Sequence, residues 1–377
     1  MLKLYIPSSK YQIKQFKLYT NSFIEELKRE QEDIYISIRR DAMKLPSTFG
    51  MEDEQPIDLL IENCEKLNQK AERLNEQYKL NKKHEKMHKV KVTHSIDVAY
   101  DSKRVGVDLN LFNEENIKIL WTTGLLHDIG RFMQLRHTGT FKDIESFDDI
   151  NFKNISDHGQ LGEQILTRDK RIQFFYPFSR IYDEFIGKVV GNHYESRITN
   201  YPININDNTF NNYSLNEIIK DKNNGRQSAN DEYEKLISWY VKIIQDVDRL
   251  DILKQVERGD FTPQLSNEKK DDVAPAIYDL FYNGKYINMN HLKKQGLWTC
   301  NAGQLLRWSF IYQLTLVSTI KNIKNLNLIE KIWEREPIEN LKSGYDFIMA
   351  LMDSLIETSP DGVYVDKEKA LKKVKKV

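Results

Sequence analysis

A histidine and an aspartate stand side by side within an otherwise apolar segment of this chain. The segment runs from Gly124 through two leucines to His127 and Asp128, and it ends at Gly130. A carboxylate in such a segment is costly to bury unless something compensates its charge, and a divalent cation can do so when an imidazole is adjacent. The pair therefore predicts a buried metal site around which this part of the chain must fold.

Further residues complete a pattern of metal ligands along the chain. His94 lies upstream of the pair, His158 and His193 lie downstream, and Asp248 closes the set within the run Asp-Val-Asp-Arg-Leu-Asp. In chain order the pattern is H, HD, H, H, D. A single histidine is more often a packed or surface residue than a ligand, but four of the eight histidines fall on this pattern. Taken together they favour a metal site.

This order resembles the HD-domain superfamily of metal-dependent phosphohydrolases over roughly residues 90 to 260, including the small and apolar residues around each ligand and the Asp-Arg-Leu-Asp ending. The resemblance assigns the core metal ligands to four positions, His94, His127, Asp128 and Asp248. His158 and His193 correspond to the additional histidines with which binuclear members hold a second metal. One departure concerns that second metal, because some binuclear members carry two consecutive histidines where this chain has His193 followed by Tyr194.

The residues around the pair fit a helical site. Asn113 followed by two glutamates is typical of a helix start, and apolar residues then recur at helical spacing as far as Leu125. His127 and Asp128 are thus expected near the C-terminal end of that helix. Adjacent residues on a helix diverge by about 100 degrees, so the two can flank one ion but cannot complete its shell. Other helices must supply the remaining ligands.

The helix expected over residues 238–253 is the donor of Asp248. Its apolar face is broken by Asp246, Asp248 and Asp251, which cannot all point inward. The resemblance selects Asp248 and leaves Asp246 as the fallback, whereas Asp251 is expected to act as a cap or to pair with a base.

Imidazole and carboxylate ligands without thiolate suit one or two ions of manganese, iron, cobalt, nickel or magnesium better than a closed structural zinc site. The resemblance implies a catalytic ion that activates a water for attack on phosphorus. Asp128 is expected to bridge two ions, and Arg131 either contacts the substrate phosphate or forms a surface ion pair. Asp97, about one turn from His94, is either an acceptor that orients the His94 ring or a solvated acid.

A competing motif, His84 to His88, fits the zinc-protease pattern H-E-x-x-H, with His94 at a third-ligand spacing. We reject this interpretation because the flanking residues are heavily charged, whereas a protease helix must pack into a cleft. Lys91 also stands where the extended motif requires glycine. The stretch is better interpreted as a solvated helix from about Pro56 to Lys89.

Composition limits the partners and the compartment. The 377 residues include 56 basic and 56 acidic ones, so the chain as a whole does not attract nucleic acid and an anionic substrate must be held locally. The two cysteines, Cys64 and Cys300, show no pairing pattern and no N-terminal apolar stretch suggests export, which favours the cytoplasm. The apolar run 305–320 contains polar residues and is expected to be a buried helix rather than a membrane span.

The fold class expected is all-α, an HD-domain helical bundle with additional helical segments at both ends. The expected divisions are an N-terminal helical region at 1–89, the metal-binding domain at 90–262 and a C-terminal helical region at 263–377. Within them we expect an amphipathic helix over 11–29, a loop over the site between 137 and 157, a second loop from 200 to 230, helices at about 328–333 and 345–357, and a solvated helix end from 367. The end regions are compatible with a homo-oligomer interface.

The function expected is metal-dependent hydrolysis of a small-molecule phosphomonoester or phosphodiester, in a nucleotide or cyclic nucleotide. Two ions would favour a phosphodiester, because they can hold the attacking and leaving oxygens together. Sugar phosphates and nucleoside triphosphates stay open, and so does a nucleotide-binding sensor or scaffold with a non-catalytic HD domain. Tyr194, Phe132 and Phe141 are the aromatic residues near enough in sequence to stack on a base, with Tyr194 preferred.

Overall fold

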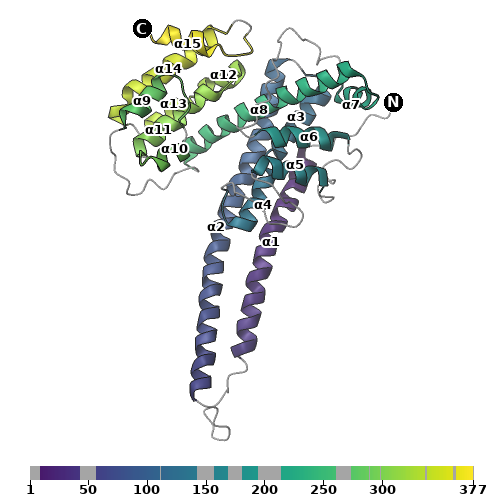
Figure 1. Ribbon diagram of the computed structural model, residues 1–377, viewed down its shortest axis with the longest axis vertical. Helices are drawn as coiled ribbons and strands as arrows, with labels where there is room; N and C mark the ends of the chain where they lie inside the picture. Colours follow the sequence, from purple (N-terminus) through teal and green to yellow (C-terminus); the bar gives the residue numbers. More distant parts are fainter. Residues whose placement is uncertain are drawn as a thin grey trace. The chain divides into compact units, whose positions relative to one another are not determined.

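The computed structural model describes residues 9–42, 57–110, 112–141, 157–168, 181–193, 214–259, 273–287, 289–297, 299–335, 338–359 and 362–376. Within these ranges every regular element is a helix (Figure 1), and the β-type pairing is confined to an isolated bridge between Leu316 and Tyr364. The all-α prediction is therefore confirmed. None of the helices described is both long and apolar enough to cross a membrane.

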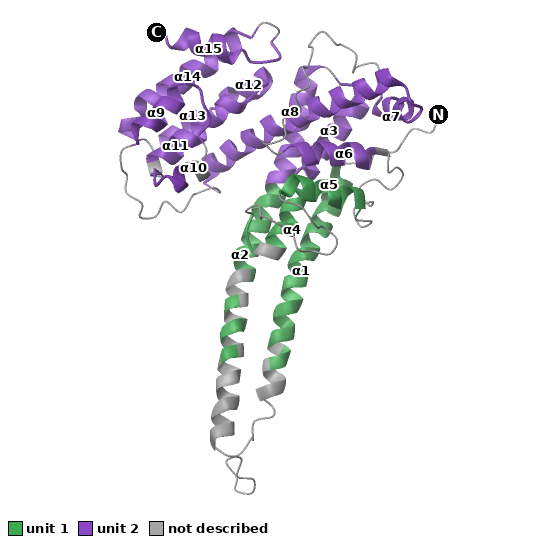
Figure 2. Cartoon of the chain, in the orientation of Figure 1, with its two compact units in different colours: residues 1–93, 128–180 green, residues 94–127, 181–377 purple. Residues whose placement is uncertain are grey.

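The chain forms two compact units, each built from separate stretches of sequence (Figure 2). The first unit comprises residues 1–93 and 128–180, and the second comprises residues 94–127 and 181–377. The boundary falls between the residues of the His-Asp pair, so His127 belongs to the second unit and Asp128 to the first.

The first unit contains α1 (Ser9–Ala42), the N-terminal part of α2 (Ile57–Leu109), α4 (Ile129–Thr138) and α5 (His158–Arg168). The long helices α1 and α2 run side by side, with the Asn81 amide donating to the Gln31 side chain at 2.8 Å. Helix α4 packs on α1 through an edge-to-face contact between Phe16 and Phe132, whose ring centroids are 5.6 Å apart. These apolar contacts hold α4, and with it the residue that precedes α4, Asp128.

The second unit contains the C-terminal part of α2, α3 (Glu114–Leu126), α6 (Ile181–Asn192), α7 (Leu215–Asn223) and α8 (Gln227–Arg258). Helix α8 is the central element, since α3, α6 and α7 all pack on it. Tyr240 of α8 is fully buried between the rings of Phe112 and Phe185, and its hydroxyl donates to the Asn116 carbonyl. This core fixes α8 against α3.

The C-terminal part of the second unit adds a layer of shorter helices. They are α9 (Pro275–Tyr282), α10 (Met289–Lys294), α11 (Cys300–Ser309), a 3-10 turn η4 (Phe310–Gln313), α12 (Val317–Asn325), α13 (Leu328–Arg335), a 3-10 turn η5 (Glu339–Leu341), α14 (Lys342–Glu357) and α15 (Lys367–Val374). Their core is apolar, with the indole of Trp308 fully buried among aromatic neighbours. Helices α12 and α13 pack on α8, which ties this layer to the helix that carries Asp248.

Two of the predicted elements differ in the structure. The expected loop at 200–230 holds α7, which begins at a capping box in which Ser214 and Glu217 exchange hydrogen bonds, and α8 already starts within it at Gln227. The expected helix over Pro56–Lys89 continues without a break to Leu109, because α2 keeps an apolar face beyond the charged stretch. Residues 200–213, and residues 142–156 of the other expected loop, lie outside the described residues.

The expected single helix at 305–320 is interrupted. Helix α11 gives way to η4, and the extended residues that follow it precede α12. The cause is a buried carboxylate. Asp246 of α8 accepts hydrogen bonds from the backbone amides of Thr315 and Leu316, at 3.0 and 2.8 Å, and from the Thr315 hydroxyl. Those amides therefore bind a side chain instead of continuing a helix.

Gly130 is required where α4 meets α5. A Cβ atom at this position would lie 2.2 Å from the His158 carbonyl oxygen and 2.9 Å from the Gly162 nitrogen, both of them backbone atoms that cannot rotate away. Gly130→Ala should therefore lower the free energy of unfolding by about 3 kcal/mol, through overpacking. The measurement is a urea unfolding curve, with Lys86→Ala on the exposed face of α2 as control. Equal midpoints for the Gly130→Ala variant and the wild type would contradict the close packing.

Candidate metal centre

His127 lies at the end of α3, where the sequence positions its ring from two sides. Asn113 caps the start of α3 by accepting from the Asn116 amide at 2.9 Å. Near the other end, Gly124 lets α3 approach α2, since a Cβ there would lie 2.9 Å from the Ala99 Cα. The fully buried His127 ring donates from Nδ1 to the Gly124 carbonyl at 2.8 Å, which leaves Nε2 as the ligand atom.

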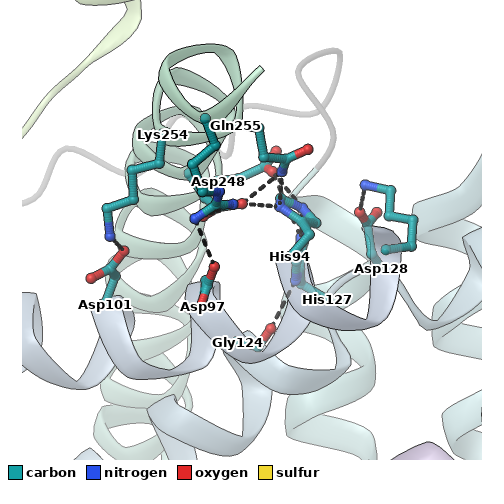
Figure 3. A network of polar contacts seen from close by, with 12 residues as sticks. His94, Asp97, Asp101, Gly124, His127, Asp128, Asp248, Lys254 and Gln255 are labelled. Carbon is teal, nitrogen blue, oxygen red and sulfur yellow. Dashed lines mark hydrogen bonds and ion pairs between the residues drawn. The ribbon is translucent and has the colours of Figure 1, made fainter. Parts of the chain in front are cut away.

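Helix α2 supplies His94, and α8 supplies the carboxylate that faces both imidazoles (Figure 3). The His94 Nε2 atom lies 3.1 Å from Asp248 Oδ1 and 3.2 Å from His127 Nε2, and His127 Nε2 lies 3.8 Å from the same carboxylate oxygen. His94, His127 and Asp248 thus offer ligand atoms that all lie within 4.8 Å of one another. Both histidines are buried, whereas 29% of the Asp248 side chain is exposed, so the group can be reached from solvent.

The charge of Asp248 follows from these contacts. Burial would raise the pKa of its carboxyl, but the His127 and His94 imidazoles beside it hold that pKa well below its usual range. Asp248 is therefore an anion at neutral pH, the form that binds a cation.

His193 follows the end of α6 and extends the group in the second unit. Its Nδ1 atom donates to the Val190 carbonyl at 2.6 Å, and the Gln245 side chain of α8 donates to the His193 carbonyl at 3.1 Å. The His193 ring packs edge to face on His127 with centroids 5.3 Å apart. Because Nδ1 of this buried ring is engaged by the Val190 carbonyl, Nε2 is the atom that the ring offers as a ligand.

Asp128, His158 and Arg131 come together in the first unit. Asp128 lies between α3 and α4, and its buried carboxylate has the His158 Nε2 atom 3.4 Å and the Arg131 Nε atom 3.8 Å from Oδ1. Lys91 of α2 forms an ion pair with the other oxygen, Oδ2. The Arg131 guanidinium also donates to Gln134 and to the Phe141 carbonyl. Two cationic side chains, the Lys91 ammonium and the Arg131 guanidinium, therefore flank the Asp128 carboxylate, and we call them the cationic pair.

These contacts decide between the alternatives that the sequence left open for the neighbouring acids. Asp97 does not orient His94, because its carboxylate pairs with Arg258 at 3.2 Å, while the acid at His94 Nδ1 is Asp251 at 2.7 Å. Asp251 was expected to cap a helix or pair with a base, and its contacts with His94 and, at 3.9 Å, with Arg258 fit the second alternative. Asp246, the fallback ligand, is committed to the Thr315–Leu316 backbone.

The aromatic residues expected near the substrate have different outcomes. Phe132 is buried between Phe16 and His88, so it belongs to the core of the first unit and does not face a substrate. Phe141 lies beside the cationic pair, with its ring 5.8 Å from the Lys91 ammonium. Tyr194 lies outside the described residues.

The H-E-x-x-H stretch does not form a metal-binding group among the described residues. His84 and His88 are buried, contrary to the solvated helix expected there, while Glu85 lies on the exposed side and pairs with Lys28 at 3.2 Å. Burial lowers the pKa of both histidines, so they are neutral packing residues at neutral pH. The protease interpretation thus fails because its glutamate points away from its histidines.

Two polar residues near the site were missed from sequence. Lys91 stands one helical turn before His94, and Gln255 stands one turn after Asp251. Their spacing from the predicted ligands is the signal that could have found them, because residues three or four apart share a helix face.

The fold and these donor groups define a class of protein, an all-helical one with a buried His/Asp cluster that is consistent with a metal-dependent phosphohydrolase site. Comparison with protein families matches residues 92–253 to the HD domain. The chain thus carries an HD domain with helices on both sides of it, and the resemblance noted from the sequence is confirmed. Comparisons with curated proteins and with solved structures find no match.

The donor set fits a divalent metal. Imidazole nitrogens and carboxylate oxygens are ligands of manganese, iron, cobalt and nickel, and each histidine of the cluster has its second nitrogen bound to an acceptor, as metal-binding histidines usually do. Such a cluster is typical of the divalent metal sites of HD domains.

Variants of two aspartates on α8 test metal binding and folding separately. Asp248→Asn should abolish metal binding and lower the unfolding midpoint less than Asp246→Asn does, because this side chain is partly exposed and contacts two imidazoles rather than the backbone. Asp246→Asn should keep metal binding but lower the free energy of unfolding by about 2 kcal/mol or more. The reason is that an amide cannot accept all the hydrogen bonds of the buried carboxylate. Metal analysis by mass spectrometry and urea unfolding test the two variants. Loss of metal from the Asp246 variant alone would reverse the assignment.

Proposed function

We propose that the protein is a metal-dependent phosphohydrolase that acts on a nucleotide or a cyclic nucleotide. The observation that carries the proposal is the buried group of His94, His127 and Asp248 within the HD domain. Two imidazoles and one anionic carboxylate, with ligand atoms within 4.8 Å of one another, suit a divalent cation that keeps positions open for water and substrate.

A second ion is proposed at Asp128, His158 and His193. Each of these side chains is buried, and the peptide bond between His127 and Asp128 links the two ligand groups covalently. Asp128 is then the bridging ligand, as the family resemblance implies. The support for this second ion is the burial of the three ligands and the contact of His158 with Asp128.

The residues around Asp128 are proposed to hold the substrate. When bound, the ions supply an activated water and neutralise charge on the phosphoryl oxygens. Arg131 lies next to the Asp128 carboxylate and donates to the substrate phosphate. Lys91 adds a second positive charge next to the same carboxylate. Phe141 and Tyr194 are the proposed stacking partners for a base.

A sensor or scaffold with a non-catalytic HD domain is the alternative. The partly exposed Asp248 and the cationic pair favour turnover, because a site that only stores a buried ion has no need of solvent access or of a phosphate-binding surface. The proposed compartment is the cytoplasm, and the substrate is a small molecule rather than a nucleic acid.

Hydrolysis by the full chain loaded with Mn²⁺ tests the proposal. A panel of nucleoside monophosphates, triphosphates, cyclic nucleotides and bis(p-nitrophenyl) phosphate should include at least one compound that is hydrolysed, and a chelator should stop the reaction. Asp128→Ala should abolish the activity, and Arg131→Gln should lower kcat by about 100-fold, the usual cost of losing one transition-state donor.

Glu85→Gln is the matched control. It removes the acid on which the protease alternative depends and leaves the proposed ligands in place, so phosphohydrolase activity should be unchanged. Nucleotide binding without turnover under every metal tried would favour the sensor instead.

A further inference from the structure

We propose that Asp251 is a positioning residue that fixes the ring and the tautomer of His94 for metal binding, with Gln255 holding the Asp251 carboxylate. This inference rests on the proposed metal site. It assigns to α8 two functions at once, because the same helix supplies the ligand Asp248 and the acceptor behind the ligand His94.

His94 lies between two carboxylates of one helix, of which Asp248 is the one labelled in Figure 3. Asp248 faces Nε2 at 3.1 Å, and Asp251 accepts from Nδ1 through Oδ2 at 2.7 Å. Asp248 and Asp251 are three residues apart, so they project from the same side of α8. With the Nδ1 proton donated to Asp251, the Nε2 lone pair faces Asp248 and His127, as the proposed metal requires.

Gln255 completes the arrangement one turn further along α8. Its amide donates to the same Asp251 oxygen at 2.6 Å, and both side chains are buried. The Arg258 guanidinium lies 3.9 Å from the other oxygen of Asp251, too far for a hydrogen bond. The strong partners of this carboxylate are therefore His94 and Gln255, and its charge is directed at the imidazole.

Asp97 offers an internal comparison. It stands on α2 within one turn of His94, and the sequence left this role open for it, but its carboxylate pairs with Arg258 at 3.2 Å and is one-third exposed. Both acids lie near His94 and both can contact Arg258. Only Asp251 is bonded to the imidazole, so the two differ in the interaction under test.

A carboxylate behind a ligating histidine has a defined effect. It fixes the tautomer, restrains the ring and makes the imidazole a stronger ligand, and loss of such a partner weakens metal affinity by about 10- to 100-fold. A residue that only held α2 against α8 would change stability without changing the coordination of the metal.

Metal titration of the full chain separates these effects. Co²⁺ affinity is measured by calorimetry and the ligand field by visible absorption for the wild type, Asp251→Asn, Asp251→Ala and the control Asp97→Asn. We expect Asp251→Asn to weaken Co²⁺ binding by about 10-fold and to shift the absorption bands, because the amide keeps an acceptor but loses the charge. Asp251→Ala should be weaker still, and Asp97→Asn should match the wild type.

The remaining outcomes are distinct. Wild-type affinity and an unchanged spectrum for Asp251→Asn would overturn the positioning role while leaving the metal site intact. An equal loss in Asp97→Asn would show a general electrostatic effect and would also overturn it. If the wild type binds neither Co²⁺ nor Mn²⁺, the proposed function fails, and this inference fails with it. The isosteric Asp251→Asn variant decides the question if Asp251→Ala does not fold.

Discussion

One buried imidazole, that of His94, is held at both of its nitrogens by carboxylates of a single helix, and the geometry of the candidate site depends on this interaction. Two carboxylates can be brought together in a largely apolar interior only where hydrogen bonds compensate them, so the contact tolerates one register of α2 against α8. Ion pairs continue along the same two helices, from Asp97 to Arg258 and from Asp101 to Lys254. The position of His94 is thus set by a row of polar contacts rather than by apolar packing alone.

The two ligand groups differ in their electrostatic character. The group around His94 combines acids with imidazole rings, an arrangement that attracts cations. The group around Asp128 combines one acid with the ammonium of Lys91 and the guanidinium of Arg131, so positive charge is in excess there. A phosphoester needs both kinds of surface, one for the metal and one for the anion, and the His127–Asp128 peptide bond joins them. Because His127 and Asp128 are adjacent in sequence, the chain links the group that attracts cations directly to the group that attracts anions.

Much of this arrangement could be predicted from the sequence, and the failures have physical reasons. The all-α class follows from helical periodicity, which is a local property of the chain, and the HD domain was expected from the resemblance of its ordered ligand residues to that superfamily. The partner of His94 could not be chosen locally, because Asp97 is near in sequence whereas Asp251 is 157 residues away and is brought close only by the packing of α8. The break before α12 was missed for a similar reason, since it depends on a carboxylate 70 residues distant. The burial of His84 and His88 was hidden by the charges of their exposed neighbours.

Asp246 gives the C-terminal layer a role in the integrity of the domain. This carboxylate stands two residues before Asp248, and burial raises its pKa, while Arg249 and the amides of Leu316 and Thr315 oppose that rise. The family match ends at residue 253, well before those amides. An excised fragment bounded by the match would lack the backbone donors of this carboxylate, two residues from the candidate ligand Asp248. The minimal autonomous module is therefore longer than the recognisable domain, and shortened versions made for crystallisation should retain the chain through Leu316 and the layer that supports it.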